Sequence, residues 1–205
     1  MFKSTIAALG TVFLLSTAPA QAQSTEVEPV LGDYLQPLGL GEFNDGLWRG
    51  YEQDGWFVLQ NVTDPVAIRY YEMPMMEGDG ELTLRANVYA RNDDGEGVAA
   101  TGLIFDFGEE NSTYIAFLLA ANNELMAINR DLDGMDVIYA DPDDPQGRGD
   151  GSDVLEVRIA GTRAQMFLND QLFRNYDLTH RPFFDRGGII ALGTGRLGFW
   201  GLDAQ

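Results

Sequence analysis

The sequence has no cysteine, one histidine and few basic residues. Without cysteine the chain can form no disulfide and no thiolate metal site, and it cannot be a lipoprotein anchored through a cysteine. Its stability therefore has to come from a hydrophobic core. The histidine, His180, precedes Arg181 and Pro182, and no G-x-S-x-G nucleophile motif occurs in the sequence. We therefore interpret His180 as a loop residue and not as part of a Ser-His-Asp triad.

Positive charge is scarce. Lysine and arginine together number 13 against 32 aspartates and glutamates, which gives a formal net charge of -19 at neutral pH. A surface with this excess repels nucleic acid and anionic membranes. The expected partners are therefore neutral molecules, cations or metal ions.

The sequence also lacks an apolar run long enough to span a membrane. Lys3 precedes an apolar stretch from Ile6 to Leu15, which is shorter than the ~20 residues of a transmembrane helix. Small residues follow, with Ala-x-Ala spacings that end at Ala20 and Ala22. This pattern predicts a signal peptide over residues 1–22, cleaved near Ala20 or Ala22, and a periplasmic or secreted protein with no membrane span.

The remaining chain is long enough for one domain. Residues 23–46, with Pro29, Pro37 and several glycines, are expected to form an irregular lead-in. Residues 47–205 are expected to form a single domain, because 45% of the chain is apolar, and this content fills the core of one β-sandwich. No internal repeat is visible, which argues against propellers and solenoids.

The clearest structural pattern lies between residues 154 and 176. Leu155, Val157 and Ile159 alternate with Glu156, Arg158 and Ala160, as in a strand with one buried face. Gly161-Thr162 interrupts this strand, and a second strand ends at Asn169-Asp170, two residues that tolerate the positive φ of a tight turn. The pattern predicts three antiparallel strands joined by two tight turns.

Further strands are predicted along most of the domain at the spacing of an all-β fold. They are Trp56–Val62, Val66–Glu72, Glu81–Arg91, Val98–Phe107, Thr113–Ala120, Glu124–Arg130, Met135–Ala140, Gly188–Leu192 and Arg196–Asp203. With the hairpins this makes about twelve strands, within the range of a jelly roll. The expected fold is an all-β, antiparallel β-sandwich.

Two stretches carry a family resemblance. The run EVRIAGTRAQMFLNDQLF, residues 156–173, resembles the penultimate hairpins of concanavalin A-like, laminin-G-like jelly rolls, and GGIIALGTGRLGFWGLDAQ, residues 187–205, is similar to their closing strands. Together they cover roughly the last quarter of the chain. The strand pattern also distantly resembles the secreted bacterial domains called 3-keto-disaccharide hydrolases. The resemblance implies architecture and does not by itself imply a site.

The strand Glu81–Arg91 supplies the first candidate site. Its apolar residues point one way, and Arg85, Asn87 and Tyr89 point the other, where an aromatic ring can stack on a sugar and polar groups can bind hydroxyls. Tyr71, Asp106 and Tyr114 lie on strands expected to neighbour it. The first hypothesis is thus a non-catalytic glycan-binding module that uses a concave sheet; the alternative is a solvated sheet face.

A second hypothesis is an enzyme. The residues Glu77, Asp79 and Glu81 form an E-x-D-x-E string that resembles the catalytic string of family 16 retaining glycoside hydrolases, which implies a nucleophile and a general acid acting on poly- or disaccharides. In that family the intervening residues are apolar, whereas both are glycine here. A solvated acidic turn is the alternative interpretation.

A third hypothesis is a calcium-stabilised surface adhesion or structural protein. Five carboxylates share a loop rich in proline and glycine, where Ca²⁺ would relieve their repulsion, and laminin-G-like jelly rolls carry such a rim ion. A mobile acidic loop is the alternative. None of the three hypotheses requires a cofactor beyond this ion. The candidate ligands are Asp141, Asp143, Asp144, Asp150 and Asp153.

Two smaller sets of residues complete the expectations. Asn61-Val-Thr63 and Asn111-Ser-Thr113 fit the glycosylation sequon. Five aromatic residues lie in apolar strand runs and are expected in the core: Trp56, Phe105, Phe117, Phe199 and Trp200.

Overall fold

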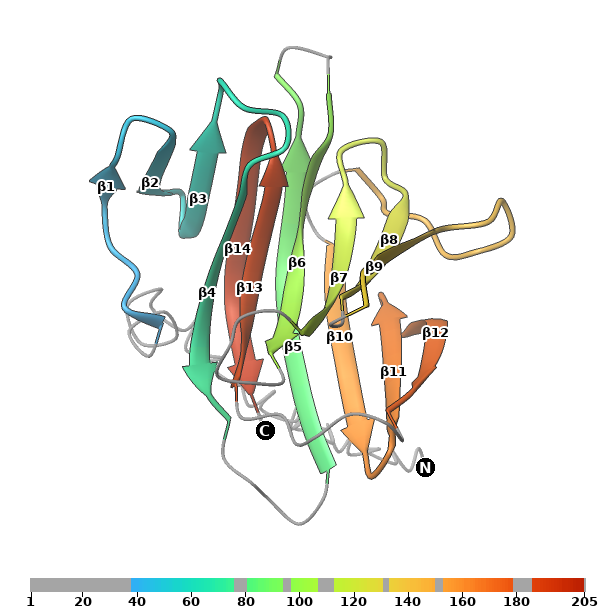
Figure 1. Ribbon diagram of the computed structural model, residues 1–205. Helices are drawn as coiled ribbons and strands as arrows, with labels where there is room; N and C mark the ends of the chain where they lie inside the picture. Colours follow the sequence, from blue (N-terminus) through green and yellow to red (C-terminus); the bar gives the residue numbers. More distant parts are fainter. Residues whose placement is uncertain are drawn as a thin grey trace, which may run out of the picture.

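The computed structural model describes residues 38–75, 81–93, 97–106, 113–130, 133–149, 153–178 and 186–204. These residues form fourteen strands in two antiparallel sheets (Figure 1). No helix among them is long and apolar enough to cross a membrane. The prediction of an all-β antiparallel sandwich is confirmed.

One sheet has eight strands in the spatial order β1-β2-β3-β14-β5-β10-β11-β12. The strand that follows all others in the sequence, β14, thus lies in its interior, between β3 and β5. The bounds are β1 Phe43–Asn44, β2 Trp48–Gln53, β3 Trp56–Asn61, β14 Gly195–Ala204, β5 Glu81–Arg91, β10 Asp153–Ala160, β11 Arg163–Leu168 and β12 Gln171–Asp177.

The other sheet has six strands in the order β4-β13-β6-β7-β8-β9. It lies in front of the eight-stranded sheet in the view of Figure 1. The bounds are β4 Ile68–Pro74, β13 Arg186–Gly193, β6 Ala99–Asp106, β7 Tyr114–Ala120, β8 Leu125–Arg130 and β9 Met135–Tyr139.

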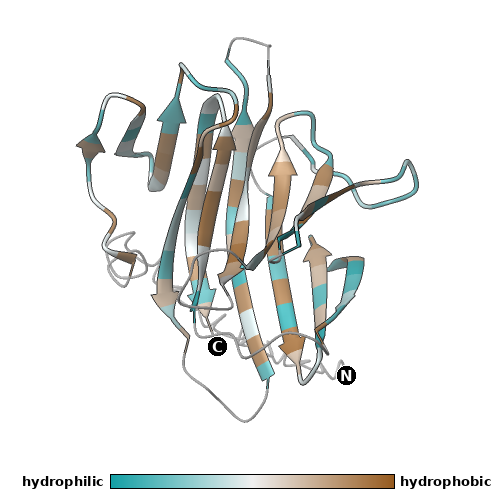
Figure 2. Cartoon of the chain, in the orientation of Figure 1, coloured by the Kyte–Doolittle hydropathy of each residue, from teal (hydrophilic) through white to brown (hydrophobic). Residues whose placement is uncertain are grey.

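The main core fills the space between the sheets. The eight-stranded sheet contributes the buried side chains of Leu84, Val157 and Phe199, and the six-stranded sheet contributes Leu103 and Phe117. Period-two alternation explains the arrangement, since every second residue of β5 and β10 faces this core. Figure 2 shows the same alternation as bands of brown and teal along both strands.

The outer face of the six-stranded sheet is also apolar. A second buried cluster there includes Ile104, Leu118, Ile128 and Ile190, with Val137 of β9 packed against it. Strand β7 is therefore buried along its whole length. A strand that is apolar on both faces produces a continuous hydrophobic run, which is the pattern of YIAFLLA in β7.

The hairpins predicted between residues 154 and 176 are present as β10, β11 and β12. The first turn uses Gly161 at φ 57°, and the second uses Asn169 and Asp170 at φ 49° and 65°. Two consecutive positive φ values match the twist of the flanking strands in a two-residue hairpin, and Asn and Asp tolerate them better than most residues.

The structure adds strands near the start of the domain. The predicted bounds of β5 agree with the structure, whereas β2 was not among the predicted strands and β1 lies within the segment expected to be an irregular lead-in. Short edge strands such as the two residues of β1 give too little periodicity to be recognised in a sequence.

Candidate functional site

The outer face of the eight-stranded sheet carries Arg85, Asn87 and Tyr89. On β5 the alternate residues Leu84, Ala86 and Val88 are fully buried in the core, so the three polar and aromatic side chains must point outward. Each of them is partly exposed. The structure therefore brings these three predicted ligand residues together on one face.

The ring of Tyr89 lies flat across the neighbouring strand β14. Tyr89 is directly opposite Gly198, and a Cβ on that glycine would come within 2.0 Å of a ring carbon. Trp56 and this ring form an edge-to-face pair, with 5.0 Å between centroids and an interplanar angle of 67°. Trp200 lies 6.4 Å from Trp56. Three rings thus form an aromatic platform on this face.

The expectation that all five strand aromatics lie in the core holds only in part. Phe105, Phe117 and Phe199 are buried, but Trp56 and Trp200 are partly exposed on the outer face. Each of these tryptophans is adjacent in sequence to a buried phenylalanine, and adjacent residues of a strand point to opposite faces. Strict alternation from Phe57 and Phe199 was the signal that could have placed them correctly.

A row of basic and polar residues borders the platform. In the strand register Arg49 of β2 is opposite Gln60 of β3, Gln60 is opposite Arg196 of β14, and Arg196 is opposite Arg91 of β5. Because residues in register share a face, all four side chains project outward from adjacent strands. The next row along the strands reads Tyr51, Val58, Gly198 and Tyr89.

These two rows are in contact with each other. The guanidinium carbon of Arg49 lies 4.8 Å from the ring centroid of Tyr51, and that of Arg91 lies 5.4 Å from the centroid of Tyr89. Burial raises the pKa of Tyr89, and the nearby Tyr51 adds to this rise. We call this group the aromatic–arginine surface, and it comprises Arg49, Tyr51, Trp56, Tyr89, Arg91, Arg196 and Trp200.

A charged network continues the same face toward β10. Glu156 is directly opposite Arg85 and is only 4% exposed. Its carboxylate accepts a hydrogen bond of 2.6 Å from Arg85 and another from Arg158, and Arg158 lies over the ring of Phe167. Glu156 therefore fixes the positions of two guanidinium groups on this face.

The other three predicted ligand residues lie elsewhere. Tyr71 belongs to β4, where its hydroxyl accepts a 2.8 Å hydrogen bond from Arg69 and its ring packs edge-on against Phe57 toward the core. Tyr114 of β7 is buried in the outer cluster of the six-stranded sheet, and Asp106 ends β6. The structure does not bring these residues to Arg85, because their strands pair within the other sheet.

The acidic string is only partly described by the structure. Glu81 is exposed at the first position of β5. It lies eight residues from Tyr89 on the same strand, a distance of ~27 Å at the usual rise of a strand. Glu77 and Asp79 lie outside the described residues.

The predicted calcium ligands have several different environments. Asp144 accepts two 2.7 Å hydrogen bonds from Arg174, which also lies 3.5 Å from Asp141. Asp153 is 1% exposed, and its carboxylate accepts hydrogen bonds from the backbone N–H of Arg148 and from Asn169 Nδ2. Both carboxylates thus have structural partners of their own.

Asp143 is exposed, and Asp150 lies outside the described residues. Within the part of the chain that the structure describes, no three His, Cys, Asp or Glu side chains are placed to hold a metal ion. The calcium site remains a prediction.

The two glycosylation sequons differ. Asn61 is 1% exposed, and its Nδ2 donates to the carbonyl oxygens of Asp64 and Gly193 at 2.7 and 2.9 Å. Its Oδ1 accepts hydrogen bonds from the backbone N–H groups of Thr63 and Asp64. A glycan on this nitrogen would replace those bonds, so the folded chain cannot carry one there. Asn111 and His180 lie outside the described residues.

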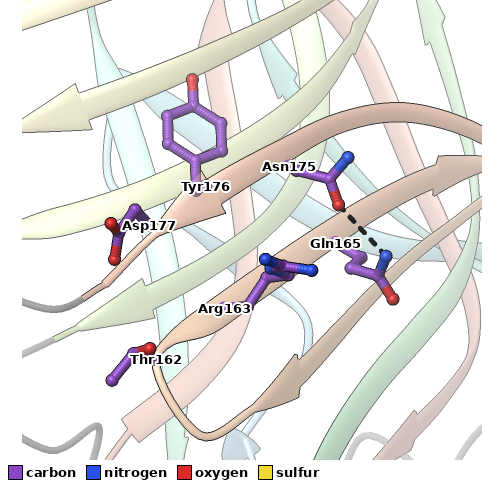
Figure 3. A pocket seen from close by; sticks show the side chains of 6 residues that line it. All are labelled: Thr162, Arg163, Gln165, Asn175, Tyr176 and Asp177. Carbon is purple, nitrogen blue, oxygen red and sulfur yellow. Dashed lines mark hydrogen bonds between the residues drawn. The ribbon is translucent and has the colours of Figure 1, made fainter.

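A hollow of about 540 Å³ lies at the β12 edge of the eight-stranded sheet, six strands away from β2, which carries Arg49. Gln165 Nε2 donates a 3.1 Å hydrogen bond to Asn175 Oδ1. Figure 3 shows Tyr176 pointing away from this pair, toward the other sheet. Burial raises the pKa of Tyr176. The remaining lining residues are Thr162, Arg163 and Asp177.

Comparison with known proteins identifies the architecture. No family model and no curated protein sequence matches the chain. Similar solved structures include the alginate lyase AlyC3, with 8% identity and a TM-score of 0.54 over 78% of each chain. A Family 7 alginate lyase, A1-II′, has 12% identity and a TM-score of 0.53 over 82% of this chain and 86% of the lyase.

A sialidase has 11% identity and a TM-score of 0.54 over 80% of this chain, which corresponds to 16% of the sialidase. At these identities the likeness concerns the fold alone. Together with the two antiparallel sheets, it identifies the protein as a β-sandwich of the jelly-roll type.

Proposed function

We propose that the protein is a periplasmic or secreted, non-catalytic glycan-binding module. Its ligand would lie on the outer face of the eight-stranded sheet, over the aromatic–arginine surface and the adjoining Asn87 and Arg85. The observation that carries the proposal is the flat ring of Tyr89, held against Gly198 and flanked by Trp56 and Trp200.

The chemistry of this face suits a sugar. A pyranose ring presents C–H groups on its faces and hydroxyls at its rim, so it is bound by an aromatic plane with hydrogen-bonding groups beside it. Tyr89 supplies the plane. Asn87, whose Nδ2 lies 3.4 Å from the carbonyl oxygen of Trp200, and Arg85 supply polar groups next to it.

The comparisons support the broad ligand class. Two of the similar structures are described as alginate lyases and one as a sialidase, names that refer to action on glycans. Proteins with the same fold can have unrelated activities, so this support is limited to glycans as the class of ligand. Membership in the concanavalin A-like group rests on the sequence resemblance described above.

Binding is favoured over catalysis by the carboxylates on this face. A glycosidase needs two carboxyl groups on either side of the scissile bond, one of them able to donate a proton. Glu156 instead accepts hydrogen bonds from two guanidinium groups, and Asp170, also near Arg85, is 74% exposed in its side chain. Glu81 is distant from the platform.

The proposal is tested with a glycan array, followed by titration of each hit with the intrinsic tryptophan fluorescence as readout. Two of the three tryptophans, Trp56 and Trp200, lie on the platform, and Trp48 is buried. We expect ligand to change the emission and to protect it from acrylamide quenching. Tyr89→Ala should lower the affinity roughly 5- to 150-fold, since stacking on an aromatic residue contributes on the order of 1–3 kcal/mol.

Tyr139→Ala is the matched control, because Tyr139 is 63% exposed on the other sheet. An array without hits, or equal affinities for Tyr89→Ala and the parent, would reject the proposal. The parent protein should release no new reducing ends from a bound glycan. If it does release them, and Glu81→Gln does not, the enzyme hypothesis would be correct and the binding module would be rejected.

A further inference from the structure

We infer that the glycan ligand carries anionic groups, carboxylates or sulfates, and that Arg49, Arg91 and Arg196 bind them. The inference rests on the proposed function and specifies its ligand class. It also revises the expectation from net charge, which favoured neutral or cationic partners.

Four of the twelve arginines, Arg49, Arg85, Arg91 and Arg196, lie where the ligand is proposed to bind. Lys3 is the sole lysine, so every later basic residue is an arginine. Arg49, Arg196 and Arg91 occupy one row across four adjacent strands, interrupted by Gln60 alone. Adjacent strands lie ~4.8 Å apart, so three guanidinium groups fall within a span of about 15 Å.

Two members of this row carry like charges on facing positions. Arg196 and Arg91 are directly opposite in an antiparallel pair, an arrangement that is unfavourable for like charges. In a chain with a net charge of -19, an acidic residue would be more expected than an arginine at either position. A local arrangement that works against folding is typical of a binding site.

Within the described ranges, two of the three guanidinium groups have no carboxylate partner. Among the described residues neither Arg49 nor Arg91 forms an ion pair, and both side chains are exposed. Each lies over a tyrosine ring instead, which holds the guanidinium group on the surface without neutralising it. Arg196 is neutralised by Asp93, through hydrogen bonds of 2.7 and 2.8 Å.

Arginine suits anionic oxygens in particular. Its planar guanidinium group donates two parallel hydrogen bonds to a carboxylate or a sulfate and remains charged at any physiological pH. A sugar stacked on Tyr89 would displace the guanidinium group of Arg91 from over the ring and leave it beside the sugar's substituents. The face thus combines a plane for the sugar ring with donors for an acidic substituent.

The test compares acidic polymers with their neutral forms. Affinity electrophoresis and calorimetry would use polygalacturonate, alginate and hyaluronan, each with its carboxyl-reduced form, and dextran sulfate with dextran. We expect binding to at least one acidic polymer and loss of it in the matched neutral form. The carboxylate and sulfate arms identify which anionic group is bound.

Three variants and one control locate the contact. Arg91→Gln should lower the affinity for the acidic polymer about tenfold, the usual loss for a charge-assisted hydrogen bond, and Arg91→Lys should restore only part of it. Asp93→Asn should raise the affinity, because it frees Arg196. Arg148→Gln removes the same charge from an exposed residue of the loop after β9 and should have little effect.

The outcomes separate this inference from the proposed function. Equal binding of an acidic polymer and its neutral form, or equal losses in Arg91→Gln and Arg148→Gln, would overturn the anionic ligand while the glycan-binding surface stands. Binding to none of the polymers and to no glycan on the array would overturn both.

Discussion

The ring of Tyr89 rests on Gly198 of the neighbouring strand, and no other residue at position 198 leaves room for it. An added Cβ would come within 2.0 Å of one ring carbon and 2.5 Å of another. The ring would therefore have to shift, and it already packs against Trp56.

We therefore expect Gly198→Ala to lower the free energy of unfolding by about 1–3 kcal/mol, the usual cost of overpacking, and to abolish glycan binding. Chemical denaturation and fluorescence titration measure the two effects. Gly41→Ala is the control, since a Cβ there meets nothing within 4 Å. In a Tyr89→Ala background the cost of Gly198→Ala should shrink, because the clash is removed. An unchanged cost would show that the ring does not rest there.

Asn61 is the second place where one side chain determines local structure. Its five hydrogen bonds join the turn after β3 to Gly193 of β13. Asn61→Ala would leave buried backbone groups without partners, at a cost of about 1–3 kcal/mol each. We expect a clearly lower melting temperature, whereas Asn175→Ala, at an exposed site, should change it little. Mass spectrometry of protein made in a glycosylating host should find Asn61 unmodified.

Stability should depend on pH through Asp144. Hydrogen bonds from Arg174 lower the pKa of Asp144 below its ordinary value of 3.8. A lowered pKa in the folded state stabilises the fold above the unfolded pKa, and this contribution disappears as the pH falls through the folded value. The stability difference between parent and Asp144→Asn should therefore be full at pH 6 and shrink below about pH 4.

Urea unfolding at several pH values measures this difference. In an Arg174→Met background the effect of Asp144→Asn should lose most of its pH dependence, because the donor is absent. A difference between parent and Asp144→Asn that stays constant down to pH 2 would contradict the assignment.

The predicted calcium site is tested by the effect of Ca²⁺ on the melting temperature. A ligand that binds the folded chain raises its melting temperature, so Ca²⁺ at millimolar concentration should stabilise the protein relative to EDTA if the acidic loop binds it. The double variant Asp141→Asn, Asp143→Asn should abolish this shift without affecting Asp153, whose oxygens have other partners. Equal melting temperatures of the parent in Ca²⁺ and EDTA would show that the folded protein does not bind Ca²⁺ in this loop.

Local patterns in the sequence were sufficient for much of the fold. The alternation in Glu81–Arg91 predicted both the bounds of β5 and the outward direction of Arg85, Asn87 and Tyr89. The turn residues Asn169 and Asp170 predicted the last hairpin. Both features arise from residues close together in the chain, where steric preference and period two act directly.

The composition of the site could not be predicted in the same way. Arg49, Arg196 and Arg91 form a row only because β14 inserts between β3 and β5, a pairing across more than a hundred residues. The residue pattern within one strand does not show which residues of a distant strand lie opposite it. For the same reason Tyr71 and Tyr114 were expected beside Tyr89, although their strands belong to the other sheet.

The position of β14 also governs the order in which this molecule can assemble. The β2–β3 hairpin reaches the remainder of its sheet through β14 alone, so a nascent chain that has not yet produced residues 195–204 keeps the edges of β3 and β5 unpaired. Such open edges recruit other chains, and pairings between distant segments form slowly. Truncation before Gly195 should therefore yield an aggregating polypeptide and not a smaller sandwich.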